Sequence, residues 1–94
     1  MAPEKTVRLR ITGNVQGVGY RIWATRTASG LGLHGWVRNR LDGTVEALAT
    51  GAPEQIALLI EACRRGPYGA HVTEVTAVPA EDDGSIGFTA IPTE

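Results

Sequence analysis

Hydrophobic and polar residues first alternate over residues 6–12, where Val7, Leu9 and Ile11 are separated by arginines. A period of two residues is typical of a half-buried β-strand. Residues 34–40 and 44–50 are predicted as the second and third strands. The Asp42-Gly43 pair between them favours a tight hairpin, because glycine readily adopts the positive φ that such turns require. We therefore expect these two strands to be antiparallel neighbours.

Apolar residues repeat at helical spacing in two other segments. The first predicted helix begins at Arg21 and stops at the glycines at positions 30 and 32. Its apolar residues are Ile22, Trp23, Ala24, Ala28 and Leu31. The second begins near Pro53, which suits a first helical turn, and its apolar face consists of Ile56, Leu59, Ile60 and Cys63.

Residues 72–78 are rich in β-branched side chains, but their alternation is imperfect, so this fourth strand is expected to contain a bulge or to be buried on two sides. Residues 87–91 predict a short closing strand. The order β-α-β-β-α-β is the ferredoxin-like pattern, an α+β sandwich with an antiparallel sheet of order 4-1-3-2 and both helices on one face. We expect residues 1–94 to form one domain, with residues 1–5 flexible.

Composition narrows the functional classes. The chain has 94 residues, a formal charge of −1 and a pI near 6.1, which gives no electrostatic case for a nucleic-acid partner. Cys63 is the single cysteine, and with only His34 and His71 beside it no zinc-site spacing occurs. No signal peptide and no apolar run long enough for a membrane span are found. We expect a cytoplasmic monomer without metal or other cofactor and without a membrane partner.

Residues 13–21 join the first strand to the first helix and contain three glycines and Arg21. Free backbone N–H groups and the helix dipole favour an anion at such a position, and a guanidinium can bind two phosphate oxygens. The segment is thus a candidate phosphate cradle. It is equally compatible with a surface turn followed by a solvated Arg21.

Asn39 is predicted near the carboxyl end of the second strand. In the ferredoxin-like pattern the first and second strands are parallel, with the third between them, so Asn39 and the glycine loop lie at the same sheet edge. An amide can accept a hydrogen bond from a water and donate one to an oxyanion, which suits orientation of a nucleophile. Alternatively, Asn39 only prepares the turn at residues 41–43.

The segments 13–21 and 35–45, which read GNVQGVGYR and GWVRNRLDGTV, resemble the two signature segments of the acylphosphatases. The resemblance extends over nearly the whole chain. It implies metal-independent hydrolysis of carboxyl-phosphate anhydrides, with Arg21 binding the phosphate and Asn39 positioning the attacking water. It also implies a backbone cradle formed by Val15, Gln16, Gly17, Val18, Gly19 and Tyr20. The main departure is Tyr20, where that family more often has Phe, which leaves the packing beneath the loop open.

The residue inventory agrees with this chemistry. An acyl phosphate releases a carboxylate, a weak base that needs no general acid, and neither signature segment supplies one. Phosphoryl transfer depends mainly on positioning and charge stabilisation, which backbone N–H groups, Arg21 and Asn39 can provide. Because no histidine lies in either segment, we expect a phosphate oxygen of the substrate to accept the proton of the water.

Two other classes of function remain open at this level. One is an RNA-binding module of the same topology, but the first and third strands do not expose the stacking aromatics that such modules use. The other is a non-catalytic phosphate sensor, or an accessory domain that works beside larger catalytic domains. The length of 94 residues speaks against the accessory domain, and the presence of both Arg21 and Asn39 speaks against the sensor.

Overall fold

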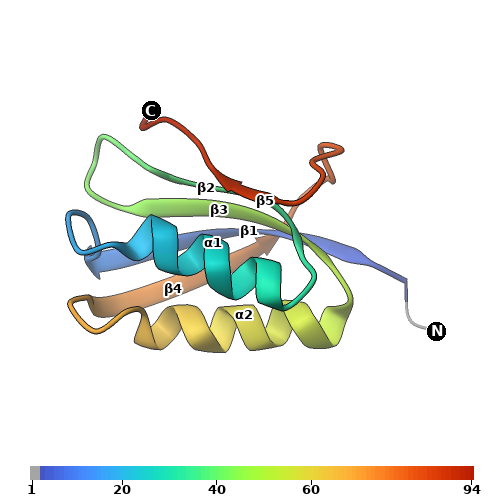
Figure 1. The fold of residues 1–94 in the computed structure, drawn as a ribbon, viewed down its shortest axis with the longest axis horizontal. Coiled ribbons are helices and arrows are strands. Elements are labelled where there is room, and N and C mark those ends of the chain that lie inside the picture. The colour runs from blue at the N-terminus through green and yellow to red at the C-terminus, as the bar shows by residue number, and fades with distance from the viewer. Residues whose placement is uncertain (1–2) are drawn as a thin grey trace.

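The computed structural model describes residues 3–94, which form two helices and one five-stranded sheet of order β4-β1-β3-β2-β5 (Figure 1). The elements are β1 (Lys5–Asn14), α1 (Tyr20–Gly30), β2 (His34–Asn39), β3 (Val45–Gly51), α2 (Pro53–Arg65), β4 (His71–Pro79) and β5 (Phe88–Ala90). The ferredoxin-like order predicted from the pattern is confirmed. Of the segment 1–5, residues 1–2 lie outside the described residues, and Lys5 already pairs with Gly51.

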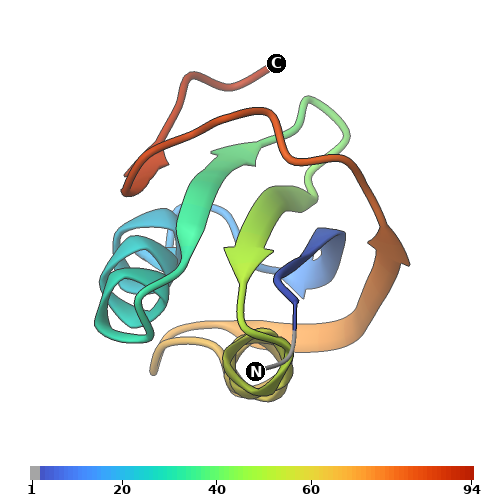
Figure 2. The same ribbon diagram turned by 90° about the vertical axis from the view of Figure 1, so that its right-hand side faces the viewer.

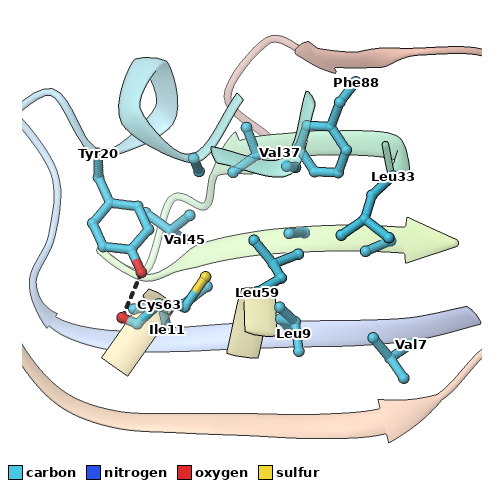
Figure 3. Close-up of a cluster of buried hydrophobic side chains, with 14 of the residues drawn as sticks. Val7, Leu9, Ile11, Tyr20, Leu33, Val37, Val45, Leu59, Cys63 and Phe88 are labelled. Atoms are coloured by element: carbon cyan, nitrogen blue, oxygen red, sulfur yellow. Dashed lines mark hydrogen bonds between the residues drawn. The ribbon is translucent and has the colours of Figure 1, made fainter. Parts of the chain in front are cut away.

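Both helices pack on the same face of the sheet, as Figure 2 shows end-on. Between them and the sheet lies the core, which includes Leu9, Ile11, Val37 and Leu59 (Figure 3). The alternation of β1 explains this arrangement, since its apolar side chains all face the helices. No helix among residues 3–94 is both long and apolar enough to cross a membrane.

The predicted turn and bulge are both present. Gly43 has a φ of 94°, and the Asp42 carboxylate accepts hydrogen bonds from the backbone N–H and the hydroxyl of Thr44. The register between β1 and β4 shifts after Thr12, so that one extra residue of β4 accounts for its imperfect alternation. The alternative prediction, that β4 is buried on two sides, is wrong, because most of its residues are exposed.

One feature differs from the pattern-based expectation, and the pattern left a second one open. The closing strand β5 pairs parallel with β2, so the sheet is mixed and not purely antiparallel. Ile22 does not join the core; its side chain is 62% exposed, whereas Ala24 and Ala28 are buried. Ile22 is two residues from Ala24, which places it roughly 200° away around the helix.

The face of the sheet opposite the helices carries paired charges. Glu46 on β3 accepts from the Arg38 guanidinium at 2.8 Å, and Arg8 and Arg40 lie at 3.7 and 3.6 Å from the same carboxylate. The connection from β4 to β5 crosses this face (Figure 2), and the Trp36 indole donates to Asp83 at 3.0 Å. Three arginines of this face therefore share the carboxylate of Glu46.

Candidate active site

The loop between β1 and α1 holds the start of the helix in an open conformation. Gly17 and Gly19 have φ values of 73° and 80°, and within residues 3–94 a Cβ placed at either position would meet no atom within 4 Å apart from its immediate chain neighbours. Gly19 is the N-cap of α1, and the first intrahelical bond runs from Trp23 N–H to its carbonyl at 3.1 Å. The first backbone N–H groups of α1 are not capped by any side chain of residues 3–94. They present partial positive charge toward the loop.

Asn39 is the last residue of β2, and the sheet register fixes its position. Asn39 and Ile11 both pair with Val45, so Asn39 lies level with Ile11, three residues before β1 ends at Asn14. Its backbone carbonyl accepts from the N–H of Glu94 at 3.1 Å, in the segment that continues β5 along β2. Strand alternation puts the Asn39 side chain on the same face as Val37, where α1 packs.

The Oδ1 atom of Asn39 is buried and has no hydrogen-bond partner among residues 3–94. Buried polar atoms nearly always have a partner, and an unpaired one costs about 1–3 kcal/mol. An acceptor left in this state at the end of a strand is suited to a ligand or a water. The alternative in which Asn39 only prepares the hairpin leaves this oxygen unexplained, because the turn is held by Asp42.

A pocket of about 320 Å³ joins the two segments. It is lined by Val15, Gly17, Gly19, Tyr20, Arg21, Ile22, Asn39 and Ala90. The structure thus brings Arg21 and Asn39 to one pocket with most of the predicted cradle. Gln16 and Val18 do not line it, and Val18 packs against the hydrophobic core instead. Ile22 and Ala90 line the pocket although no sequence motif indicated them.

The Gln16 side chain has a role that its position in a glycine loop did not reveal. Its amide nitrogen donates to the carbonyls of Arg40 and Thr44, at 2.8 and 2.9 Å. Those carbonyls flank the turn that follows Asn39. Gln16 therefore ties the loop to the β2–β3 hairpin and fixes the two halves of the pocket relative to each other. In the sequence, the only indication of this role is a polar amide side chain within a loop that is rich in glycine.

Tyr20 lies beneath the loop, and its hydroxyl, which a Phe would lack, has a clear structural role. The ring is buried, and its hydroxyl donates to the carbonyl of Cys63 at 2.8 Å (Figure 3). Burial, followed by electrostatic interaction with Cys63, raises the pKa of the Tyr20 hydroxyl far above its ordinary value. The hydroxyl therefore remains protonated and serves as a structural link between α1 and α2.

Among residues 3–94, the pocket lining includes one charged side chain, that of Arg21, and no carboxylate. Arg21 forms no salt bridge within residues 3–94, so its guanidinium can pair with an anion. The nearby Asp42 does not line the pocket, and hydrogen bonds from the Thr44 hydroxyl and N–H hold its pKa below the ordinary value. Its carboxylate is consequently a poor proton acceptor. No cluster of three or more metal-ligating side chains occurs in the described part of the chain.

Comparison with known proteins places these features in a family. The acylphosphatase family model matches residues 7–90. An acylphosphatase of Rhodospirillum rubrum is 49% identical over 88 residues, covering 94% of this chain and 97% of that protein. The structure of an acylphosphatase from Coxiella burnetii superposes with a TM-score of 0.90 at 32% identity, covering 94% of this chain and 93% of that one. For a Bacillus subtilis acylphosphatase the TM-score is 0.88 at 33% identity, with 92% and 97% covered.

Proposed function

The chain belongs to the acylphosphatase family, hydrolases that act on acyl phosphates, and we propose that the pocket between residues 15–21 and Asn39 is its active site. The reaction cleaves the carboxyl-phosphate bond and yields a carboxylate and inorganic phosphate. The observation that carries the proposal is the buried, unpaired Oδ1 of Asn39, which shares a pocket with the uncapped start of α1.

In this proposal the phosphate lies in the cradle of residues 15–20. Backbone N–H groups at the start of α1 donate to its oxygens, and the Arg21 guanidinium binds a further pair. These donors are most effective in the transition state, where negative charge spreads over the equatorial phosphate oxygens. No carboxylate occurs among the lining residues of the described chain, which supports this assignment because a carboxylate would repel the anion.

Asn39 positions the attacking water. Its Oδ1 accepts a hydrogen bond from the water, and its Nδ2 donates to a phosphate oxygen, so that nucleophile and phosphorus are held in line. A phosphate oxygen takes the proton of the water as the P–O bond forms, and the carboxylate leaves with the electrons of the broken bond. Neither a general acid nor a metal ion is required in this scheme.

The decisive experiment measures hydrolysis of benzoyl phosphate in excess chelator. The wild-type protein is expected to be active, and Arg21→Ala and Asn39→Ala to lose about 100-fold or more in kcat/KM, the usual effect of removing one oxyanion contact. Arg26→Ala and Asn14→Ala are matched controls, since both residues are exposed and neither lines the pocket. Wild-type kcat/KM in Arg21→Ala would refute the assignment, and loss of wild-type activity in chelator would refute the metal-free reaction.

We also propose that residues 1–94 act as one domain, as a cytoplasmic monomer without a nucleic-acid partner. The lone buried Cys63 supports a reducing compartment. On the sheet face where related RNA-binding modules stack bases, arginines are paired with Glu46 and Trp36 is held by Asp83. Sedimentation equilibrium tests the monomer, and filter binding with single-stranded RNA tests the absence of RNA affinity.

A further inference from the structure

Two residues of the pocket have no role in binding phosphate or water. Ile22, in the first turn of α1, and Ala90, the last residue of β5, line the pocket together with Val15. The Ile22 side chain is 62% exposed. Five other large apolar side chains of residues 3–94 are more than half exposed, but none of them lines this pocket.

These residues give the pocket an apolar wall next to the cradle. Arg21 supplies the only charge among the lining residues of the described chain, and in the proposed function it is occupied by the phosphate. Arg26 lies about one helical turn beyond Ile22 on α1; it is exposed and is not among the lining residues. A group that extends from the bound phosphate along this wall therefore meets aliphatic side chains.

The covalent structure of the substrate decides which chemical group contacts this wall. In an acyl phosphate a single oxygen joins the phosphorus to the carbonyl carbon, so the acyl group begins within the same pocket as the phosphate. A volume of about 320 Å³ is in the range of small-molecule sites and exceeds the needs of a phosphate alone. The rest of the acyl group must therefore extend out of the pocket along the side chains that line it.

We propose that Ile22 and Ala90 bind the acyl group and give the enzyme a preference for neutral, apolar acyl phosphates. This inference rests on the proposed function. Burying a methylene group typically changes a binding constant about three- to fourfold, and a half-open wall yields about twofold for each one. The preference should appear in kcat/KM, because it adds to the binding of substrate and transition state alike.

The experiment compares kcat/KM for acetyl, butyryl and hexanoyl phosphate in wild type and Ile22→Ser. For the wild type, kcat/KM is expected to rise about 16-fold from acetyl to hexanoyl phosphate, because four additional methylenes contact the wall at about twofold each. In Ile22→Ser the ratio of hexanoyl to acetyl should fall to about twofold or less. Ile86→Ser is the matched control, because Ile86 is 91% exposed and is not a pocket residue. It should keep the wild-type ratio.

Two further comparisons test the charge of the occupant. Adipoyl phosphate has the same six carbons as hexanoyl phosphate and ends in a carboxylate, so it should be the poorer substrate. Ala90→Asp places a charge in the wall and should reduce the hexanoyl-to-acetyl ratio as Ile22→Ser does. A preference for adipoyl phosphate, which Arg26 would favour, overturns the inference.

The outcomes also separate this inference from the proposed function. Hydrolysis of all three substrates with equal kcat/KM, or a chain-length ratio unchanged in Ile22→Ser, overturns the acyl-binding role and leaves the acylphosphatase activity intact. Absence of hydrolysis of every acyl phosphate overturns both.

Discussion

Gln16 and Asn39 carry the same amide group and come from the two segments that meet at the pocket, yet their surroundings give them different roles. The Gln16 amide nitrogen is engaged by two protein carbonyls, whereas the Asn39 Oδ1 is buried without a partner. A satisfied amide fixes structure, and an unsatisfied one is available to a ligand. The chemical type of a residue in the sequence does not distinguish these two cases; its hydrogen-bond partners do.

Gln16→Ala should impair the reaction without removing any group that contacts the substrate. The loop loses two bonds to the hairpin that carries Asn39, so the cradle and the water-positioning amide shift relative to each other. We expect kcat for benzoyl phosphate to fall on the order of tenfold, because small misplacements at a reacting centre are costly. Gln16→Glu, which keeps the shape but cannot donate to the two carbonyls, should behave alike. An unchanged kcat in both variants would show that the coupling is unnecessary.

At the scale of elements, the close approach of β2 to β3 is decided by one glycine. A Cβ on Gly35 would lie 1.8 Å from the carbonyl oxygen of Leu48 and 3.2 Å from the Phe88 ring. The first of these contacts is with backbone, which cannot yield without moving a strand. The pairing of β2 with β3, which positions Asn39 at the pocket, therefore requires a residue without a Cβ at position 35.

Gly35→Ala is expected to lower the free energy of unfolding by about 3 kcal/mol, since overpacking against backbone adds to the strain of a positive φ. Gly84→Ala is the control, because Gly84 also has a positive φ but has open space around it. It should lose only about 1 kcal/mol, the cost of the left-handed conformation. Urea unfolding of both variants measures the difference. Equal losses would mean that the strands adjust to the methyl group.

The helix α1 shows how an element can be predicted correctly while the position of one of its residues is left open. Its extent was close to the prediction, and Ile22, one of the apolar residues of the pattern, lies at the pocket and not in the core. Periodicity identifies a helix, yet over a single turn it does not decide which of several apolar residues faces the core. That choice depends on where the sheet and β5 lie.

At the scale of the whole molecule, the Tyr20–Cys63 hydrogen bond joins the two helices through the core (Figure 3). Burial raises the pKa of the Cys63 thiol to about 11 and raises that of the Tyr20 hydroxyl still further. Both groups remain neutral in the folded protein at a pH where the unfolded chain begins to ionise. Their contribution to stability is therefore complete below their ordinary pKa values and is lost as the pH rises through the folded values.

The free energy of unfolding should consequently decrease above about pH 9, where thiols and then phenols of the unfolded chain ionise. Tyr20→Phe removes the phenol, so its stability should fall less steeply between pH 9 and 11 than that of wild type. Urea midpoints across this range test the difference in slope. Parallel curves for the two proteins would show that Tyr20 does not contribute to the alkaline loss.

The sequence by itself determined the order of strands and helices, the turn at Asp42-Gly43, the β4 bulge as one of two alternatives, and the two segments that meet at the pocket. These depend on short-range requirements, namely side-chain periodicity and the backbone freedom of glycine. Only the tertiary structure decided that Gln16 clamps the hairpin 24 and 28 residues away, that β5 pairs parallel with β2, and that Ile22 lies at the pocket. Such contacts follow from strand register and helix packing, which join residues far apart in the chain.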